Sequence, residues 1–575
     1  MTDRSWFKDA SLIAHTGARL LAEDPMHALV QVSRRLPAGL RRHLEPKPGP
    51  ASLTRAFRAW LSDHPADAAR MLAALSTGPQ RPHSPLSDSS PAGRLRELLA
   101  VALGELDAEA SSPAGRARAL WQLGALTEAI EELADSDSVL AQRIESERRM
   151  LTPGMEVRLT RRTPLRDGTG VLMSLTNCLP WTRSGYTARS RAICSALKQA
   201  GVDVSVVTRI GYPVTVGLPA RPVLHHVDGV PHHRLPVAEL EPTLDGRAGQ
   251  QAALVRDLAE KLRPSVLHTT TDYTNAVATR AVAEATGLPW VYEMRGMLEL
   301  TWIASRPLRH QPTAAASERV RLLRAREAEL AGDADAVICL SRVQKDDLVG
   351  RGVEADKIVV APNAVADKVL ERPRTDPLTA RERLGLPREG FWVGTVTSMV
   401  DYEGLDTLVE AVALAREAGH DLRAALVGDG VARPGLIHRV HELGLKDAIV
   451  FPGRVPADEA LHWHEALDVF TVPRRDTPVC RYVTPLKPLE AMALGRPVLA
   501  SDLPALAEVT ADGAVGALVP PDDPQAWASA LIAAQSDRQW RRTAEERGRA
   551  HAARHTWAHV AADYCDLYRR LSEES

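Results

Sequence analysis

The sequence is poor in cysteine and has no long apolar run. Its five cysteines, at positions 178, 194, 339, 480 and 565, are scattered and odd in number, and they form no Cys-x-x-Cys or Cys/His cluster. This pattern argues against a disulfide framework and against a zinc site. No stretch of about 18 apolar residues occurs, so we expect no helix that spans a bilayer.

An excess of either charge is also missing. The 575 residues include 71 Lys and Arg and 73 Asp and Glu. This balance argues against a general nucleic-acid binder, because binding to phosphate backbones is typical of strongly basic surfaces. The first residues, Met1 to Arg4, are not followed by the apolar core of a secretion signal. We therefore expect a cytoplasmic protein, with contact at the inner face of the membrane as an alternative.

What the chain does contain is typical of a globular protein with several domains. Hydrophobic residues make up 45% and charged residues 25% of the sequence. Residues 1–165 show helical apolar spacing, for example at 66–75 and 95–106, and a Pro/Ser-rich stretch at 78–91 is typical of a linker. We expect helices at 121–133 and 139–150 to form a hairpin. This region is predicted to be a helical accessory domain and a candidate for recruiting a protein partner.

From residue 166 the pattern changes to short apolar strands that alternate with helices. The expected strands lie at 170–175, 204–208, 266–269, 290–292 and 336–340, and then at 391–396, 424–427, 449–451, 469–472 and 497–500. Such alternation favours parallel sheets covered on both faces. We predict two doubly wound Rossmann-like α/β domains, at 166–365 and 366–550, that face a cleft, and a C-terminal helix at 551–575. Ligands of such sheets bind beyond the carboxyl ends of the strands.

One segment of the second unit, Thr484 to Ser501, places opposite charges at the start of a helix. Pro488 suits a first helical turn, and Lys487 and Glu490 lie beside it. A helix start with a cation is a place where an anionic ligand can bind. The alternative is an ordinary helix–strand unit with two surface charges.

The second unit resembles the donor domain of the retaining glycosyltransferases of family 4, which have the GT-B architecture. The motifs that carry the resemblance follow one another in order: Tyr402-Glu403-Gly404-Leu405, Val427-Gly428-Asp429-Gly430, Phe451-Pro452-Gly453-Arg454-Val455 and Thr484-Pro485-Leu486-Lys487-Pro488-Leu489-Glu490. The resemblance extends from residue 168 to the C-terminal helix. It implies transfer of a hexosyl group from a nucleotide diphosphate sugar, as co-substrate, to a glycan, a lipid-linked acceptor or a small molecule. It implies no further cofactor and no metal.

The resemblance also implies donor-binding roles for particular residues. Glu490 corresponds to the carboxylate that accepts hydrogen bonds from ribose hydroxyls, and the helix start near 488 would hold the diphosphate. Gly453 and Arg454 belong to the loop that holds the base. Gly428 and Gly430 are expected to let the backbone approach the ligand closely. Ser398, Thr484 and Leu486 complete the expected donor site.

The chain departs from the family pattern in its cations. The arginine and lysine that usually follow the first donor-domain strand are absent from residues 397–404, and Tyr482 replaces the earlier of two glutamates. We therefore expect Lys487, with one of Arg474, Arg475 and Arg481, to bind the diphosphate. The alternative for the arginines is that they are solvated loop charges.

On the acceptor side, the resemblance indicates three strand ends. Gly185 is expected to open a helix that faces the donor phosphates. His268 ends a strand, and Glu293 and Arg295 end the next one. Arg295 is a candidate for neutralising the donor or positioning the acceptor, and Glu293 for orienting it. Two structural alternatives stay open: a satisfied histidine, and a buried Glu–Arg pair.

Two further interpretations complete the prediction. If the missing cations abolish activity, the chain is a catalytically silent glycan- or nucleotide-binding scaffold whose helical domain recruits partners. An epimerase of the same architecture would need acid and base groups that we cannot place. The basic run 538–554 is either a solvated helix face or a contact with an anionic membrane surface.

Overall fold

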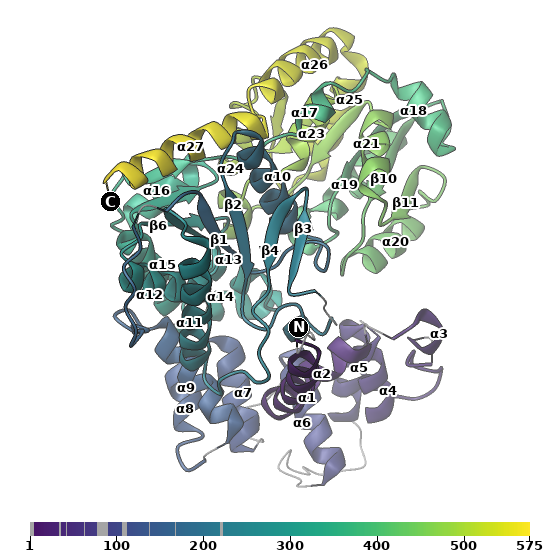
Figure 1. Ribbon diagram of the computed structural model, residues 1–575. Helices are drawn as coiled ribbons and strands as arrows, with labels where there is room; N and C mark the ends of the chain where they lie inside the picture. Colours follow the sequence, from purple (N-terminus) through teal and green to yellow (C-terminus); the bar gives the residue numbers. More distant parts are fainter. Residues whose placement is uncertain are drawn as a thin grey trace.

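The computed structural model describes residues 5–574, apart from 34–35, 42, 63, 77–89, 106–111, 137, 167 and 219–221. The predicted linker at 78–91 lies almost entirely outside the described residues. Two α/β domains form the body of the molecule, and helices from the first part of the chain lie at one end of it (Figure 1). This arrangement confirms the predicted fold class.

The N-terminal region is helical throughout its described residues. Its helices are α1 (Ser5–Glu23), α2 (Pro25–Ser33), α3 (Ala38–Arg41), α4 (Leu53–Leu61), α5 (Pro65–Ser76), α6 (Pro91–Leu103), α7 (Pro113–Leu123), α8 (Leu126–Glu131) and α9 (Val139–Leu151). The helix expected at 121–133 is broken, because Gly124 adopts a left-handed conformation (φ +85°) that ends α7. Helices α2 and α4–α6 share a small core of their own. Helices α7–α9 instead share a core with the first α/β domain.

The first α/β domain is built on an eight-stranded sheet of order β3-β4-β2-β1-β5-β6-β7-β8. Only β3 runs antiparallel to its neighbour among the described strands. The strands are β1 (Val171–Leu175), β2 (Val204–Thr208), β3 (Leu224–Val227), β4 (Val230–His233), β5 (Val266–Thr270), β6 (Trp290–Met294), β7 (Ala336–Cys339) and β8 (Ile358–Val360). The helices are α10 (Gly185–Gln199), η2 (Val214–Val216), α11 (Leu244–Leu262), α12 (Tyr273–Thr286), α13 (Leu298–Ala304), η3 (Leu308–His310), α14 (Gln311–Ala315), α15 (Glu318–Asp333) and α16 (Arg342–Gly350). The central strands are buried, as their apolar sequences require.

The second α/β domain has a six-stranded parallel sheet of order β11-β10-β9-β12-β13-β14. Its strands are β9 (Phe391–Val396), β10 (Leu422–Val427), β11 (Ile449–Gly453), β12 (Val469–Val472), β13 (Val498–Ser501) and β14 (Ala517–Val519). Its helices are α17 (Asp367–Leu370), α18 (Pro377–Leu384), η4 (Asp401–Glu403), α19 (Leu405–Glu417), α20 (Arg433–Glu442), α21 (Ala457–Ala466), α22 (Pro478–Tyr482), α23 (Lys487–Ala493), α24 (Pro504–Val509), α25 (Pro524–Ser536) and α26 (Arg538–Ala553). Two apolar clusters fill the two sides of this sheet.

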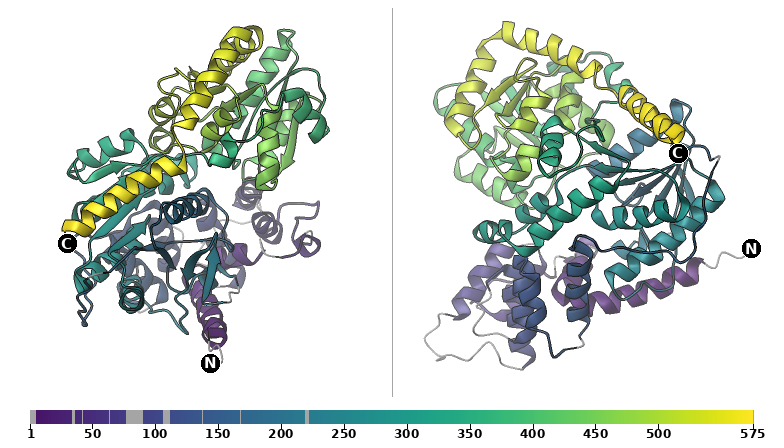
Figure 2. Two further views of the ribbon diagram at one scale, coloured as in Figure 1. Left: turned by 45° about the horizontal axis from the view of Figure 1, so that its top comes forward. Right: turned by 90° about the vertical axis from the view of Figure 1, so that its left-hand side faces the viewer.

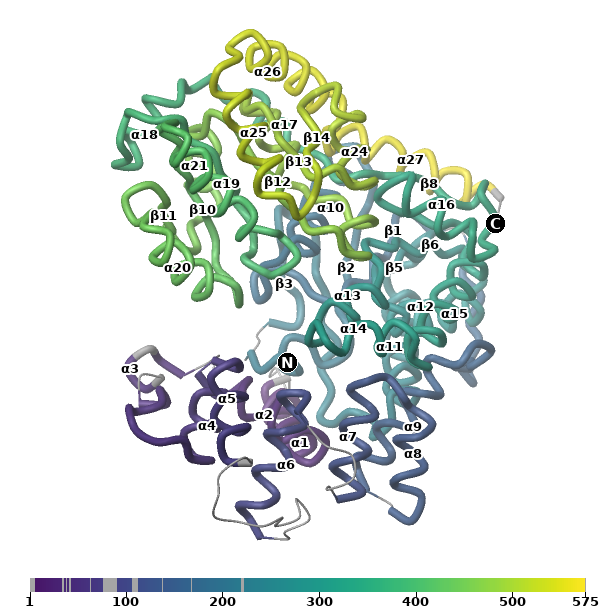
Figure 3. Tube along the Cα trace, turned by 180° about the vertical axis from the view of Figure 1, so that it is seen from behind, coloured from purple at the N-terminus to yellow at the C-terminus, as the bar shows by residue number. Residues whose placement is uncertain are grey.

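The chain crosses between the two α/β domains twice, side by side. The outward crossing follows β8, and the return leads into the last helix, α27 (Trp557–Glu574), which lies against α10 and β5 of the first domain (Figures 2 and 3). The backbone N–H of Val365 donates to the His555 carbonyl at 2.8 Å, and that of Trp557 donates to the Val365 carbonyl at 3.2 Å. These two hydrogen bonds hold the two crossings together. None of the helices in the described part of the chain is long and apolar enough to cross a membrane.

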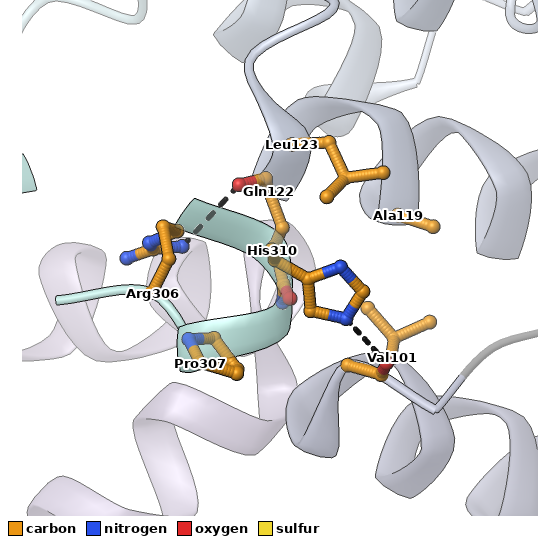
Figure 4. Close-up of a pocket in the computed structure, with 8 residues that line it drawn as sticks. Val101, Ala119, Gln122, Leu123, Arg306, Pro307 and His310 are labelled. Carbon is orange, nitrogen blue, oxygen red and sulfur yellow. Dashed lines mark hydrogen bonds between the residues drawn. The ribbon is translucent and has the colours of Figure 1, made fainter. Parts of the chain in front are cut away.

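The helical region docks on the first α/β domain at two places. Leu12 of α1 is fully buried against Ile210, Val214 and Val237. Further along, α6 and α7 meet the segment after α13 around a small cavity of about 60 Å³ (Figure 4). There His310 Nε2 lies 2.9 Å from the Gly104 carbonyl oxygen. The helical region is therefore joined to the rest of the molecule by packing as well as by the chain.

Candidate active site

Helix α23 begins with the two charges that the sequence indicated. Lys487 Nζ donates a hydrogen bond to Glu490 Oε2 over 2.7 Å, and both side chains are partly exposed. The preceding loop reaches the first domain: Asn363 Nδ2 donates to the Thr484 carbonyl over 3.0 Å, and Leu486 packs against the core around α27. The Lys487–Glu490 pair therefore lies close to the junction of the two α/β domains.

A histidine that sequence reasoning missed lies beside this pair. His464 of α21 is fully buried, with Nε2 3.7 Å from Glu490 Oε2, and neither ring nitrogen has a hydrogen-bond partner in the described structure. Burial, and then the positive charge of Lys487, hold the pKa of His464 well below its ordinary value. A neutral imidazole beside the carboxylate has one N–H that can donate a hydrogen bond and one nitrogen that can accept one, and it adds no charge. The only sequence signal was the alternation His462-Trp463-His464 on a helix, which is too common to identify a site.

The three nearby arginines are each engaged by carboxylates. Buried Arg474 donates to Glu403 Oε1 and to the Val483 carbonyl, both over 2.8 Å. Arg475 pairs with Asp406 and Asp522, and Arg481 forms two hydrogen bonds of 2.6 Å to Asp476. The arginines are thus neither freely solvated loop charges nor unpaired cations. Arg474 is an interior group that fixes the loop before α22, and a ligand would have to displace carboxylates to reach Arg475 or Arg481.

Two glycines of the donor loops lie where a side chain would collide with the neighbouring loop. A Cβ on Gly428 would lie 1.9 Å from the Thr397 carbonyl oxygen, and one on Gly430 would lie 2.2 Å from that of Met399. These glycines therefore allow the loops after β9 and β10 to approach one another, and the close approach of the backbone to a ligand stays a prediction.

The other predicted donor residues occupy the same edge of the second sheet. Ser398 is exposed directly after β9. Gly453 ends β11 with φ +83°, and Arg454 is exposed and has no hydrogen bond or ion pair within the described part of the chain. Thr484 is buried, and its hydroxyl lacks a partner there. Arg454 is therefore a candidate cation of this edge without a carboxylate partner among the described residues, whereas Lys487 is paired with Glu490.

On the acceptor side, Gly185 opens α10 as predicted from the sequence. Ser184 caps the helix: its hydroxyl accepts from the Thr187 N–H over 3.3 Å, and Thr187 Oγ1 accepts from the Ser184 N–H over 2.9 Å. A Cβ on Gly185 would contact nothing within 4 Å. The helix start therefore faces open space, which leaves room for a ligand.

His268, Glu293 and Arg295 lie in the interior. Both side chains of the His268–Glu293 contact (3.2 Å) are fully buried, and Glu293 also accepts from Arg189 over 2.9 Å and from Arg295 over 2.8 Å. Tyr568 of α27 lies 2.7 Å from His268 Nδ1. Burial favours the neutral acid, but the two arginines outweigh it and hold the pKa of Glu293 well below its ordinary value. These contacts fit the alternatives, a satisfied histidine and a buried Glu–Arg pair, and the acceptor-side and catalytic roles stay predictions.

A second residue that the sequence did not reveal is Arg209, which follows β2 at the carboxyl edge of the first sheet. Its guanidinium lies 5.9 Å from the centre of the Tyr212 ring, and its buried Nε has no hydrogen-bond partner in the described structure. Burial lowers the pKa of Arg209. Among the described residues, no group of three or more His, Cys, Asp or Glu could hold a metal ion.

Comparison with known families assigns both α/β domains. A family model described as "Glycosyl transferases group 1" matches residues 390–537, and one described as "Glycosyl transferase 4-like domain" matches residues 184–364. Together the matches cover more than half of the chain, and each falls on one of the two sheets. The chain belongs to the GT-B glycosyltransferases.

Curated relatives of this GT-B chain are named D-inositol 3-phosphate glycosyltransferase. Those of Corynebacterium urealyticum and Nocardia farcinica are 31% and 33% identical over 255 and 250 residues, which is 43% and 42% of this chain. The chain spans 59% and 54% of the length of these relatives. The relative of Paenarthrobacter aurescens is 26% identical over 401 residues, 67% of this chain and 92% of its own.

Solved structures share the GT-B fold at low identity. A sucrose-phosphate synthase of Thermosynechococcus elongatus matches with a TM-score of 0.58 and 22% identity, over 71% of this chain and 100% of its own. HepE of Anabaena, crystallised with UDP, matches with a TM-score of 0.54 and 19% identity, over 70% of this chain and 100% of its own. Neither family match includes residues before 184, so the helical region stands apart from the two GT-B domains.

Proposed function

We propose that the protein is a retaining glycosyltransferase that transfers a hexosyl group from a nucleotide diphosphate sugar to a glycan, a lipid-linked acceptor or a small molecule. The observation that carries the proposal is the Lys487–Glu490 pair at the start of α23, inside the donor-domain match and next to the domain junction. Structures of one relative, HepE of Anabaena, contain UDP and UDP-glucose, which supports a uridine nucleotide as the first donor to test.

In the proposed reaction, the pair separates when the donor binds. The Glu490 carboxylate accepts hydrogen bonds from the ribose hydroxyls, which frees the Lys487 ammonium to face the diphosphate. Negative charge builds on the diphosphate as the sugar–phosphate bond breaks, and a fixed cation at that place lowers the barrier. Retention follows if the acceptor attacks on the side that the diphosphate leaves, with a phosphate oxygen taking the acceptor proton. The protein then supplies position and charge rather than a nucleophile.

An anionic acceptor fits the first domain best. Arg209 lies at the carboxyl edge of its sheet, and its buried Nε has no hydrogen-bond partner among the described residues, so an anionic group there would supply one. The names of the curated relatives, which refer to a phosphorylated inositol, support the same chemistry. An acceptor with a phosphate or carboxylate group is therefore the first class to test.

The test measures nucleotide binding and turnover together. We expect the wild-type chain to bind UDP, and Glu490→Ala to weaken that binding by about tenfold, which corresponds to about 1.4 kcal/mol. Lys487→Ala should lower the rate of sugar release from UDP-glucose by about a hundredfold, the usual effect of losing one charge-stabilising group. Titration calorimetry and a coupled assay for released UDP supply the two readouts.

Glu410→Ala is the matched control, because Glu410 pairs with Arg439 on the surface of the same domain. Turnover that is unchanged in both site variants would show that the site is wrongly assigned. If the wild type binds none of a panel of nucleotides, the assignment of the second α/β domain as the donor domain is refuted. Binding without turnover on any donor and acceptor would favour the silent scaffold.

A further inference from the structure

His464 is a fully buried polar side chain without a hydrogen-bond partner. It lies on α21, which packs beside α23 (Figure 1), and its side chain is 0% exposed. Its ring stacks on Phe470 of β12, with the ring centres 4.9 Å apart and an angle of 23° between the planes. Neither ring nitrogen is paired in the described structure. Such a side chain is uncommon, because an unpaired polar group in the interior costs free energy.

One carboxylate lies close to this ring. Glu490 Oε2 is 3.7 Å from His464 Nε2, which is roughly 0.8 Å longer than an ordinary N–H···O hydrogen bond. The same oxygen accepts the 2.7 Å hydrogen bond from Lys487 Nζ. The other oxygen, Oε1, accepts no hydrogen bond from the described residues. Lys487 therefore holds Oε2 in this structure, and a small movement would bring His464 to the same oxygen.

The surroundings favour a neutral His464 ring with its proton on Nε2. Burial, and then the positive charge of Lys487, lower the pKa of His464 well below its ordinary value, so the ring carries a single N–H. An ionised carboxylate only accepts hydrogen bonds, so this N–H is most stable on the nitrogen that faces Glu490, which is Nε2. His464 can therefore donate to Glu490 without neutralising its negative charge.

Lys487 is the less permanent partner of the carboxylate. Its side chain is 37% exposed, against 19% for Glu490 and 0% for His464. In the proposed reaction the Lys487 ammonium moves to the diphosphate, and Oε2 then loses its hydrogen bond. A carboxylate without a partner samples several conformers, and ordering it on a ligand costs free energy. A donor that is packed in the core, as His464 is against Phe470, stays in place while the ligand binds.

We propose that His464 is a positioning residue for the nucleotide: its Nε2–H donates to Oε2 of Glu490 in place of Lys487 when the donor binds. Oε2 is then held toward the interior, and Oε1 is left to accept from the ribose hydroxyls. Glu490 keeps its full charge for the ribose, and Lys487 keeps its charge for the diphosphate. This inference rests on the proposed donor site, and it adds to that site a residue outside the four donor motifs.

Binding of UDP and of 2′,3′-dideoxy-UDP to the full chain separates ribose recognition from the other contacts. We expect the wild type to prefer UDP by about tenfold, and Glu490→Ala to bind the two nucleotides equally. His464→Phe keeps the ring but removes both nitrogens, and it should lower the preference to about twofold. His464→Gln has an amide N–H that can replace Nε2–H, and it should retain most of the preference. Titration calorimetry measures these affinities.

Two further variants test the division of roles. Lys487→Ala should weaken the binding of both nucleotides but retain the preference for UDP, because His464 would still hold Glu490. His462→Gln is the matched control, since His462 lies on the same helix, is partly exposed and pairs with Glu465 over 2.9 Å. It should bind both nucleotides like the wild type. A merely structural His464 would change the two affinities alike and leave their ratio unchanged.

The outcomes distinguish this inference from the donor site on which it rests. If the wild type does not prefer UDP, or if Glu490→Ala keeps the preference, the donor-site assignment fails and the inference is overturned with it. If Glu490→Ala loses the preference but His464→Phe keeps it, only the inference is overturned. The same conclusion follows if Lys487→Ala loses the preference, because Lys487 would then hold Glu490.

A measurement on the wild type does not depend on the folding of His464→Phe, which circular dichroism checks. In spectra of the chain labelled with ¹⁵N-histidine, the N–H signal of His464 is the one that is absent from His464→Gln. UDP should move this signal to lower field, as a shorter hydrogen bond does, whereas 2′,3′-dideoxy-UDP should move it less. A signal that neither nucleotide moves would overturn the inference.

Discussion

At the residue scale, the charges of the first domain divide into interior and exposed pairs. Glu293 joins α10, β5 and β6 through Arg189, His268 and Arg295, with no solvent contact. Glu293→Gln would leave two buried cations without their anion. Breaking a buried pair in this way costs about 3 kcal/mol or more. We therefore expect the free energy of unfolding, measured in urea, to fall by about 3 kcal/mol, while UDP binding by the folded chain stays unchanged.

The comparison for this variant is Asp228→Asn, which removes the partner of Arg191 from an ion pair at the surface. Exposed pairs contribute about 1 kcal/mol or less, so this change should have little effect. A Glu293→Gln protein with wild-type stability but a much lower rate of transfer would contradict the interior assignment. It would support the acceptor-side role that the sequence suggested.

At the scale of elements, a carboxylate of the second α/β domain caps the first turn of a helix in the first domain. Glu508 of α24 accepts from the backbone N–H of Arg342 over 2.8 Å and from that of Val343 over 3.4 Å, at the first turn of α16. These N–H groups have no partner within their own helix. The contact borders an interdomain cavity of about 400 Å³. Glu508 therefore stabilises this arrangement of the domains.

Removing that carboxylate should loosen the junction. Capping contacts of this kind contribute about 1 kcal/mol, so we expect Glu508→Ala to raise the population of separated domains several-fold. Small-angle scattering should then show a larger radius of gyration for Glu508→Ala. Glu410→Ala, which breaks a pair inside one domain, should leave the radius unchanged. If Glu508→Ala scatters like the wild type, the other crossings hold the domains without this contact.

The elements also show what the sequence could and could not predict. Buried strands such as 391–396 and 469–472 read as apolar runs whatever surrounds them, so the two sheets and the donor motifs were predictable. Partners that lie far apart in the chain were not. His268 meets Tyr568, 300 residues away, and Gly428 owes its place to the Thr397 carbonyl. Whether a charge at a strand end faces a ligand or the interior depends on such contacts.

At the scale of the whole molecule, stability should depend on pH through groups in both domains. Burial lowers the pKa of His232, on β4, and of His551, on α26, to about 4. Both histidines are therefore neutral in the folded chain above about pH 4, whereas in the unfolded chain their pKa has the ordinary value near 6.5. Between pH 6.5 and 4 the unfolded state binds more protons, so folding is weakened as the pH falls. At pH 5 each histidine should cost about 2 kcal/mol relative to pH 7.

One carboxyl group works in the opposite direction. Glu327 of α15 is buried, accepts from the Tyr292 hydroxyl over 2.6 Å, and has its pKa raised to about 8 by burial. It stays protonated in the folded chain but ionises in the unfolded one above about pH 4.5. Its contribution to stability is therefore complete below pH 4.5 and is lost as the pH rises toward 8. Between pH 7 and 5, Glu327 should offset about 3 kcal/mol of what the two histidines lose.

Urea unfolding at pH 7 and at pH 5 separates these contributions. The wild type should lose free energy of unfolding on acidification, because the buried histidines, His464 among them, lose more than Glu327 regains. Glu327→Gln removes the compensating group, so its loss between pH 7 and 5 should be about 3 kcal/mol greater than that of the wild type. His232→Asn should instead lose about 2 kcal/mol less than the wild type. Equal pH dependence in all three proteins would mean that these groups titrate alike in the folded and unfolded chains, and burial would then not control their protonation.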